Sequence, residues 1–414
     1  MVRIAIVGAG ISGLTAAHLL HPEHDVSLFE ANAYAGGHTN TIRVDTQDAT
    51  HEVDTGFIVF NDRNYPNFER LLARLGVASQ PSTMTFGVSD DAGDFEYSGA
   101  SLNGLFAKRA HLATPWFHRM VADMARFHRQ GRELLASDED PSLGHWLEGL
   151  RLSQAFIDKL IVPQASAVWS ADPGQMWTFP ARFLVEFFDN HGMLSLRDRP
   201  QWHTVAGGSR RYVEALVAPW RDRLRLATPV RAVERHDDHV TVTPHGGEPE
   251  RFDEVVLATH SDQALALLAD ATEREHEILG AIPYQANEAV LHTDRRLLPR
   301  RRRAWASWNY HLPSVTVGKP TVTYYMNRLQ SLDADEELCV TLNRTERIAP
   351  ETIIRTIPYA HPVYTREGHA AQRRHSEISG RNRTHFCGAY WRWGFHEDGV
   401  VSAMRVAEQL NGSA

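Results

Sequence analysis

Three glycines and one acidic residue near the start of the chain have the spacing of a dinucleotide-binding turn. Gly8, Gly10 and Gly13 follow the apolar run 2–7 and precede the apolar, helix-like run 14–20. In such a turn the first glycine makes the tight bend, the second lets the backbone approach a pyrophosphate, and the third lets helix and strand pack closely. Glu30 ends a second apolar run about 20 residues further on, where a carboxylate can bind a ribose hydroxyl.

A second glycine pair follows the acidic residue. Gly36 and Gly37 lie a few residues beyond Glu30 and are followed by His38. A glycine pair at this distance suits a cofactor whose pyrophosphate and ribityl chain continue past the first turn, which favours FAD over NAD. We expect the pyrophosphate to lie on the N-terminus of the following helix, where free N–H groups and the helix dipole favour an anion. The predicted contacts of this site are Gly8, Gly10, Ile11, Ser12, Gly13, Glu30, Ala31, Gly37 and His38.

With these motifs the chain resembles the FAD-dependent amine oxidase superfamily, which includes phytoene-desaturase-like and protoporphyrinogen-oxidase-like enzymes. The resemblance rests on the pattern GxGxxGL, an acid and GG, which here is Gly8, Gly10, Gly13, Leu14, Glu30, Gly36 and Gly37. It implies non-covalent FAD as the cofactor, and a flavin that carries out the redox step. The chain departs from the family at His38, because the family usually has an arginine there that would neutralise the pyrophosphate.

Two segments further along agree with the same resemblance. In the resembled family an acid-x-Gly segment passes the flavin ring, and here that segment contains Thr55, Gly56 and Phe57. The resemblance also implies a valine whose backbone meets the adenine, which is Val230, and a buried strand that ends in small residues at Thr259. A simple NAD-binding domain would not need these later signals.

The C-terminal region carries the last signal. The resembled family closes its FAD domain with a strand, a glycine, an aromatic residue and a helix, and Gly388, Phe395, Glu397 and Val400 match this segment. The resemblance implies that the helix N-terminus faces the pyrimidine end of the flavin, where its dipole stabilises negative charge. Ala389 stands where the family usually has an acidic residue.

The separation of these signals along the chain predicts a discontinuous domain. We expect an α/β protein with a Rossmann-like FAD-binding domain, of the three-layer ββα and GR2 type, interleaved with an α+β substrate-binding domain. The FAD-binding domain is predicted over 1–60, 200–262 and 376–414. The substrate-binding domain is predicted over 61–199, a largely helical insertion, and 263–375, an antiparallel sheet. Helical spacing over 102–135 is broken by Pro115, and strand-like runs occur at 288–292, 315–317, 321–325 and 338–342.

Aromatic and ionisable residues are the candidates for the reaction site. His191 and His203 each lie near an aromatic cluster and are the candidate bases for removing a proton. Lys319 is the candidate for amine oxidation, because many amine oxidases hold a water molecule near the flavin with a lysine. The residues predicted to line a substrate pocket are Trp169, Trp202, Tyr325, Trp391 and Phe395.

Within the superfamily the chain looks closest to bacterial flavoproteins similar to the N-terminal domain of plant cyclopropane fatty-acid synthases. The runs that carry this resemblance are 187–194, 199–209, 305–310, 325–330 and 386–403. It implies a fatty-acyl or phospholipid acyl chain as substrate and a lipid methyltransferase as partner. We expect an FAD-dependent dehydrogenase, desaturase or isomerase acting on such an apolar chain. Two alternatives stay open: an amine oxidase acting on a small or hydrophobic amine, and a non-catalytic flavoprotein that supports a methyltransferase.

The composition argues against several other classes of protein. There are 43 Lys and Arg residues against 51 Asp and Glu residues, a net charge of −8, whereas nucleic-acid binding needs a basic face. Two cysteines exclude a disulfide scaffold and a CxxC zinc site, and we expect no metal. No apolar run reaches the roughly 18 residues of a spanning helix, and we expect a cytoplasmic protein. The basic run 295–303 is expected to be a solvated surface, or a patch for an acyl-carrier partner or for an anionic membrane surface, at whose periphery it would hold the protein.

Overall fold

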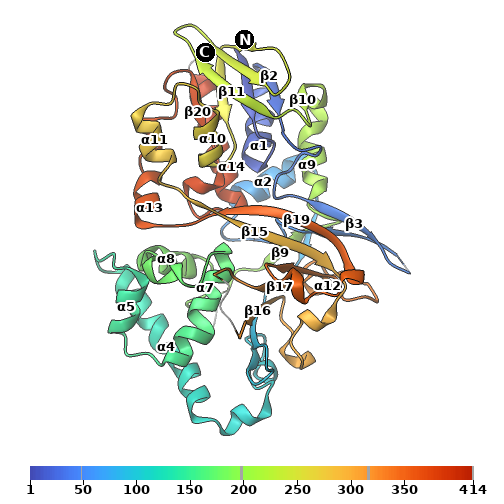
Figure 1. The fold of residues 1–414 in the computed structure, drawn as a ribbon, viewed down its shortest axis with the longest axis vertical. Coiled ribbons are helices and arrows are strands. Elements are labelled where there is room, and N and C mark those ends of the chain that lie inside the picture. The colour runs from blue at the N-terminus through green and yellow to red at the C-terminus, as the bar shows by residue number, and fades with distance from the viewer. Residues whose placement is uncertain (48, 196–198, 315–317, 413–414) are drawn as a thin grey trace.

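A five-stranded parallel sheet forms the centre of one half of the molecule (Figure 1). The computed structural model describes residues 1–47, 49–195, 199–314 and 318–412, so the strand predicted over 315–317 lies outside the described residues. The strand order is β10–β2–β1–β14–β20, and the parallel sheet confirms the predicted α/β class. Its strands are β1 (Arg3–Val7), β2 (Asp25–Phe29), β10 (Leu224–Arg225), β14 (Glu254–Leu257) and β20 (Thr384–Phe386).

The two faces of the parallel sheet are covered by different layers. Ile4 and Ile6 of β1 share a core with α1 (Ile11–Leu20), α9 (Arg210–Val217) and α14 (His396–Gly412). Ala5 and Val7 point the other way and pack against an antiparallel sheet of β11 (Val230–Arg235), β12 (Val240–Pro244) and β13 (Glu250–Phe252). Because successive residues of a strand face opposite sides, the unbroken apolar run of β1 is buried on both.

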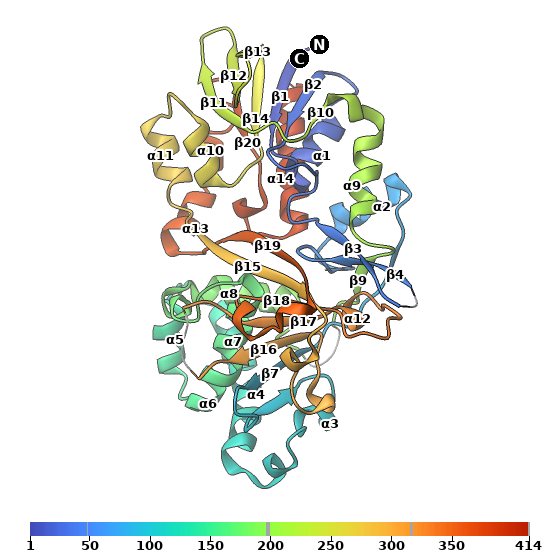
Figure 2. The ribbon, with the colours of Figure 1, turned by 45° about the vertical axis from the view of Figure 1, so that its right-hand side comes forward.

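A seven-stranded sheet lies across the second half of the molecule (Figure 2). Its order is β19–β15–β18–β17–β16–β7–β8, with β16 and β7 parallel and the other described pairs antiparallel. The longer helices that share its apolar core include α4 (Pro115–Leu135), α7 (Val162–Trp169) and α8 (Ala181–Asn190). The strands are β7 (Phe86–Asp90), β8 (Glu96–Ser98), β15 (Tyr284–His292), β16 (Trp308–Leu312), β17 (Val322–Tyr325), β18 (Cys339–Leu342) and β19 (Ile353–Pro362).

A chain of buried hydrogen bonds crosses four neighbouring strands of this sheet. His292 Nε2 bonds Thr341 Oγ1 (2.7 Å), Thr341 bonds Thr323 (2.8 Å), and Thr323 bonds His311 Nε2 (2.8 Å). The backbone N–H of Asp294 donates to His292 Nδ1 at 3.0 Å, which requires an unprotonated nitrogen there. Burial lowers the pKa of His292 to about 4 and the pKa of His311 to about 3. Both imidazoles are therefore neutral at pH 7.

Several helices outside the predicted FAD segments pack with the parallel sheet. α2 (Pro66–Leu75) contacts α9 and α14, and its Phe68, Leu71 and Leu72 belong to the core beneath that sheet. α10 (Ser261–Leu267) and α11 (Glu273–Leu279) share the opposite core with β11, and α11 contacts α13 (Arg366–Gln372). These helices therefore bury their apolar faces in the two cores of the parallel sheet.

The remaining elements are short. Pro163 lies within a continuous helical stretch, in which a π-helical turn over Ile157–Ile161 leads directly into α7. None of the described helices is both long and apolar enough to cross a membrane. The short elements are β3 (Thr41–Asp45), β4 (Thr50–Asp54), β5 (Phe60–Asn61), β6 (Ser79–Pro81), β9 (Trp202–Val205), α3 (Leu102–Leu105), α5 (Leu143–Gly149), α6 (Gln154–Phe156) and α12 (Met326–Leu329).

Candidate active site

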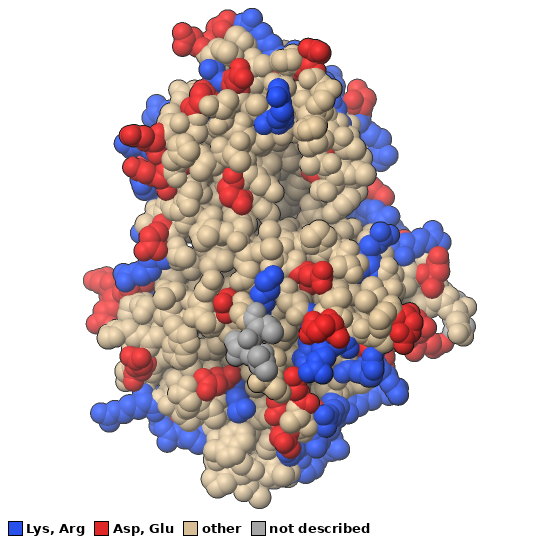
Figure 3. All heavy atoms as spheres, viewed as in Figure 1, with Lys and Arg blue, Asp and Glu red and all other residues tan. Residues whose placement is uncertain are grey.

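A cavity of about 1360 Å³ is lined by residues from both large sheets. The glycine-rich turn after β1 lines one part, and aromatic residues from β7, α7, α8 and β16 line another. The face drawn in Figure 3 is hollowed in its upper half. Single-ligand pockets usually measure about 300–1,000 Å³, so this cavity is large enough for a dinucleotide and a second molecule.

The three glycines of the first turn differ in what surrounds them. A Cβ on Gly8 would lie 2.8 Å from the carbonyl oxygen of Ala258, and a Cβ on Gly13 would lie 1.9 Å from that of Gly8. Gly10 lines the cavity and has nothing within 4 Å of its Cβ position. The turn is therefore tightly packed on its protein side and open on its cavity side, as close approach of a pyrophosphate requires.

The N-terminus of α1 opens on this part of the cavity. Gly10 is its N-cap, no side chain caps it, and Ile11 and Ser12 line the cavity, so the first N–H groups are available to an anion. Glu30 also lines the cavity, and its carboxylate accepts the backbone N–H groups of Ala9 (2.7 Å) and Asn32 (2.8 Å). Its remaining lone pairs can accept ribose hydroxyls. The residues present therefore fit a dinucleotide.

A buried carboxylate holds the turn after β4 against the cavity. Asp54 accepts hydrogen bonds from Thr41 Oγ1 (2.6 Å) and from the backbone N–H of Ser209 (2.9 Å). Its burial raises its pKa to about 6 in spite of these bonds. A Cβ on Gly56 would lie 2.3 Å from the carbonyl oxygen of His38, so a glycine is required where these two cavity-lining segments cross.

The N-terminus of α14 also reaches the cavity. His396 stacks on Phe57 with 3.4 Å between ring centroids, and its Nε2 lies 3.0 Å from both Thr39 Oγ1 and Tyr212 Oη. Phe395 and His396 both line the cavity at this helix end. The positive end of the helix dipole favours negative charge on a group held there.

The outer part of the cavity is aromatic and apolar. Phe187 and Phe395 stack at 5.2 Å, and Trp393 meets the edge of Phe187 at 6.2 Å. Among the described residues that line the whole cavity, Glu30 is the only acidic residue and Arg355 the only Lys or Arg. The lining of this outer part includes Met84, Phe86, Val168, Trp169, Phe187, Trp202, Trp308, Tyr324, Trp393 and Phe395.

His191 is the ionisable side chain among these aromatic rings. Its Nδ1 lies 2.9 Å from the carbonyl oxygen of Phe187, which can only accept, so Nδ1 carries the proton and Nε2 has a free lone pair. The ring stacks on Phe187 at 3.9 Å and lies 6.1 Å from Trp202. Burial lowers the pKa of His191 to about 4, so the imidazole is neutral at pH 7.

Three predicted cofactor contacts do not line the cavity. Gly13 packs against the turn, and Val400 lies in the core between α1 and the parallel sheet. Glu397 accepts the backbone N–H groups of Asn67 and Phe68, and so caps the N-terminus of α2. The predicted contacts that do line it are Gly8, Gly10, Ile11, Ser12, Glu30, Ala31, Gly37, His38, Thr55, Gly56, Phe57, Val230, Thr259, Gly388 and Phe395.

Three of the five predicted pocket aromatics reach the cavity, namely Trp169, Trp202 and Phe395. Tyr325 instead donates a hydrogen bond to Glu337. Trp391 packs with His375 in the core on the β11 side of the parallel sheet.

Of the predicted catalytic residues, the structure brings His191 to the cavity and leaves two outside it. His203, on β9, stacks on Phe60 at 5.9 Å and does not line the cavity. Lys319 is exposed in the turn before β17 and does not line it either.

The cavity residues that the sequence motifs did not identify include His260, Tyr359, His361, Trp393 and His396. Two of them, Tyr359 and His361, lie on β19, where every residue from 355 to 362 lines the cavity, so no alternation along the strand marks them. The others follow strand ends and carry no local pattern.

Comparison with known proteins places the chain in a family. Residues 11–411 match the model of the flavin containing amine oxidoreductases. AofH of Mycobacterium tuberculosis, named as a flavin-containing monoamine oxidase, is 26% identical over 274 residues, which are 60% of this chain and 55% of that protein. The flavin-dependent L-tryptophan oxidase RebO of Lentzea aerocolonigenes is 24% identical over 275 residues, 59% of this chain and 54% of that protein. The match thus spans about half the length of these relatives.

Solved structures share the fold over nearly the whole chain. Cyclohexylamine oxidase from Brevibacterium oxydans has a TM-score of 0.70 at 16% identity and covers 99% of both chains. A CLA-producing fatty acid isomerase from P. acnes has a TM-score of 0.65 at 15% identity, covering 99% of this chain and 98% of that one. Likeness at these identities shows the fold. With the family match over almost all of its length, the chain belongs to the flavin-containing amine oxidoreductases, a family that uses FAD as its cofactor.

Proposed function

We propose that the protein dehydrogenates, desaturates or isomerises an apolar acyl chain, such as that of a fatty acid or phospholipid. The observation that carries this proposal is the aromatic outer part of the cavity, where the described lining contains no acidic side chain. A protonated amine there would be buried without a carboxylate partner, which is costly. An alkyl chain instead gains about 25 cal/mol for each Å² of apolar surface removed from water.

His191 is the proposed base for this reaction. FAD, when bound, supplies a hydride acceptor. Formation of a carbon–carbon double bond also requires a proton to leave the neighbouring carbon, and the unprotonated Nε2 of His191 accepts it while the C–H electron pair forms the double bond. The faces of Phe187 and Phe395 stabilise the imidazolium. Isomerisation returns the hydride and the proton to the same acyl chain. Net dehydrogenation instead needs an electron acceptor, such as oxygen or a quinone, to reoxidise the flavin.

Arg355 is the proposed partner of an anionic head group. It lies on β19, is exposed, and is the only Lys or Arg among the described residues that line the cavity. A carboxylate or phosphate could pair with its guanidinium while the acyl chain enters the aromatic part.

A specific observation also supports amine oxidation as the second candidate. The stacked rings of Phe187 and Phe395, with Trp393 beside them, form an aromatic wall that could hold an ammonium by cation–π attraction. This attraction is worth about 2 kcal/mol when desolvated. The cation–π attraction would have to offset the cost of burying an ammonium without a carboxylate partner.

Anaerobic visible spectroscopy separates these candidates. The flavin of the purified protein would be titrated with unsaturated fatty acids and phospholipids, and separately with a panel of amines. Bleaching by the lipids supports the proposed function, and product analysis then distinguishes a new double bond from a shifted one. Bleaching by amines alone would overturn it in favour of the second candidate. If neither bleaches the flavin and no product forms, the acyl-chain reaction is rejected, and a supporting role beside a lipid methyltransferase takes its place.

We also propose that one tip of the molecule binds an anionic membrane surface, from which an acyl substrate would come. The tip is made by Leu102, Leu112 and Trp116, which are 78%, 55% and 43% exposed. α3, which begins at Leu102, contacts the segment Arg302–Ala304, whose two arginines are exposed. Basic side chains gather at the lower end of the face in Figure 3. Exposed apolar side chains beside arginines suit a bilayer interface, where each cation contributes about 1 kcal/mol.

Vesicle sedimentation tests this membrane proposal. The protein should pellet with vesicles of phosphatidylcholine and phosphatidylglycerol but not with phosphatidylcholine alone. Leu102→Asn together with Trp116→Ser should abolish pelleting. Leu226→Asn is the matched control, because Leu226 is 38% exposed and precedes β11 in the other half of the molecule. Pelleting unaffected by the tip substitutions would show that another surface, or none, meets the membrane.

A further inference from the structure

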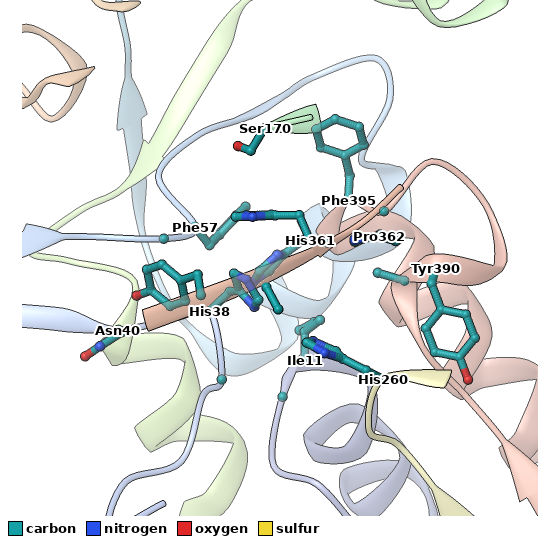
Figure 4. Close-up of a pocket in the computed structure, with 18 of the residues that line it drawn as sticks. Ile11, His38, Asn40, Phe57, Ser170, His260, His361, Pro362, Tyr390 and Phe395 are labelled. Atoms are coloured by element: carbon teal, nitrogen blue, oxygen red, sulfur yellow. The ribbon is translucent and has the colours of Figure 1, made fainter. Parts of the chain in front are cut away.

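Three histidines from distant parts of the chain meet inside the cavity. The ring centroid of His38 lies 5.1 Å from that of His361 and 6.3 Å from that of His260, and His38 stacks on Tyr359 at 4.7 Å. All four residues line the cavity, and Figure 4 shows the three histidines beside Ile11. We call His38, His260 and His361 the histidine cluster. No group of His, Cys, Asp and Glu among the described residues is arranged to hold a metal ion.

The cluster lies beside the anion-binding end of α1. His38 directly follows Gly37, and a Cβ on Gly37 would lie 3.2 Å from the Cα of Gly10. The N–H of Gly36 donates to the carbonyl oxygen of Ala9 at 2.7 Å, which fixes this segment next to the first turn. A dinucleotide pyrophosphate on the α1 N-terminus would therefore face His38.

This end of the cavity has no permanent positive charge among the described lining residues. Arg355 is the only Lys or Arg in that lining, and it lies six residues before His361 on β19, about 20 Å away at 3.3 Å per residue. The dipole of α1 supplies only about half an elementary charge, whereas a dinucleotide pyrophosphate carries two negative charges. The histidine cluster lies at this end of the cavity, where most of the negative charge of the pyrophosphate would have no positive partner.

The three imidazoles are uncharged before an anion arrives. Burial lowers the pKa of His361 to about 4, lowers the pKa of His260, and lowers the pKa of His38 well below its usual value. The Nε2 atom of His38 is buried and has no hydrogen-bond partner. The groups that face the cluster from the surrounding elements are Tyr359 on β19, Tyr284 on β15, His396 on α14, Asp262 on α10, Tyr34 and Glu30. None of these is a permanent cation.

We propose that the histidine cluster is a proton-coupled anion site, which takes up a proton when the pyrophosphate of FAD binds. Protonation of one imidazole supplies the positive charge that an arginine at position 38 would carry permanently. The proposal rests on the cofactor and does not depend on the substrate, so it can fail or succeed independently of the acyl-chain reaction.

The direction of the pH dependence follows from linkage. An anion beside the cluster raises the pKa of the imidazole that it contacts, so between the unbound and bound pKa values the complex holds one more proton than the free protein. FAD affinity should therefore fall as pH rises through neutrality. Because one proton is taken up on binding, the affinity for FAD falls by up to about tenfold for each unit by which the pH rises.

Release of FAD from the full-length holoprotein measures this dependence without any substrate. Dilution into buffers from pH 6 to pH 9, with free flavin followed by its fluorescence, gives the dissociation constant at each pH. The wild type should show a slope near one in log Kd against pH up to the pKa that the imidazole has in the complex, and no slope above it. His38→Arg should bind FAD at least as tightly at high pH and lose most of the slope. His38→Gln should weaken binding at pH 6 by at least tenfold.

His245→Gln is the matched control, because His245 is exposed at the turn after β12 and does not line the cavity. It should keep the wild-type slope. Circular dichroism of each variant checks that the fold is retained. A wild-type slope of zero, or a His38→Arg variant with an unchanged slope, would overturn the proposal. If His38→Arg does not fold, a slope unchanged in His38→Gln would overturn it equally.

Discussion

At the scale of single residues, the direction of one hydrogen bond decides what His191 can do. Donation from Nδ1 to the carbonyl oxygen of Phe187 leaves Nε2 unprotonated, and burial keeps the ring neutral at pH 7. His203 lacks this arrangement, because its Nδ1 is buried without a partner and its ring packs on Phe60 outside the cavity. The two candidate bases, equivalent in the sequence, are therefore distinguished by their surroundings.

His191→Gln should lower the rate of flavin reduction by the acyl substrate by about 10²–10⁴-fold, the usual contribution of a general base, with little change in KM. His203→Gln should stay within a few fold of the wild type. In the wild type the rate should fall as pH drops through about 4, because the imidazole then becomes protonated. Anaerobic stopped-flow measurements with both variants test this. Equal losses in the two variants would remove His191 from its proposed role.

Arg355→Gln should raise KM for a free fatty acid by about tenfold, which corresponds to 1.4 kcal/mol, and leave kcat unchanged. The methyl ester of the same acid carries no negative charge that could pair with Arg355, so its KM should not change. Steady-state kinetics with the acid and ester pair provide the check. An equal effect on both substrates would indicate that Arg355 acts on the fold of β19 and not on a head group.

At the scale of elements, the strand–turn–helix unit at the N-terminus is the part that the sequence predicts best. Its glycines, its helix and the acid at Glu30 form a contiguous pattern, and each lies where that pattern requires. The partner of Glu397 could not be predicted, because a carboxylate that caps α2 looks the same in sequence as one that contacts a cofactor. The histidine cluster was equally hidden, since its three members lie on separate elements brought together by the tertiary fold.

Two glycine substitutions in this unit should have opposite consequences. Gly13→Ala places a methyl group 1.9 Å from a backbone oxygen and should lower the free energy of unfolding by at least about 1–3 kcal/mol. Gly10→Ala meets nothing within 4 Å, so stability should change by less than about 0.5 kcal/mol. Its methyl group enters the cavity, however, and FAD affinity should fall at least about tenfold. Urea unfolding and flavin titration separate the two effects, and a stable, FAD-free Gly13→Ala would contradict this account.

At the scale of the whole molecule, two layered units enclose the cavity between them. We propose that the FAD-binding unit includes α2, α10 and α11 in addition to the predicted segments, since these helices bury their apolar faces in its two cores. The substrate-binding unit then includes the seven-stranded sheet and the helices that share its core, among them α4, α7 and α8. Its core contains the His292–Thr341–Thr323–His311 chain, which makes the stability of the whole protein sensitive to pH.

Acid should destabilise the protein partly through this chain. An unfolded histidine takes up a proton near pH 6.5, whereas the pKa of His292 in the fold is about 4, so the unfolded state binds more protons between these values. Stability contributed by the neutral ring is therefore present above pH 6.5 and is lost as pH falls toward 4. At pH 5 the loss is about 2 kcal/mol, since each pKa unit corresponds to about 1.4 kcal/mol.

His292→Asn should consequently reduce the difference in unfolding free energy between pH 7.5 and pH 5.0 by about 2 kcal/mol. Asp54 and Asp398 have raised pKa values of about 6 and 7, which affect the pH dependence in the opposite direction. Their contributions cancel when the difference measured for the variant is compared with that of the wild type, because both proteins contain them. Urea unfolding at both pH values provides the measurement, and His245→Gln should leave the difference unchanged. A variant with the wild-type difference would show that His292 does not titrate during unfolding.

The order of strands in the parallel sheet has a consequence for how the protein is made. β1 ends at Val7, yet β20, which completes the edge beside β14, begins only at Thr384. At about 5–20 residues per second, a ribosome needs roughly 20–75 s to make the stretch between them. Throughout that time the nascent chain carries an unpaired strand edge of the kind that recruits other chains. Yield in the cell should therefore depend on chaperones that shield this edge until translation ends.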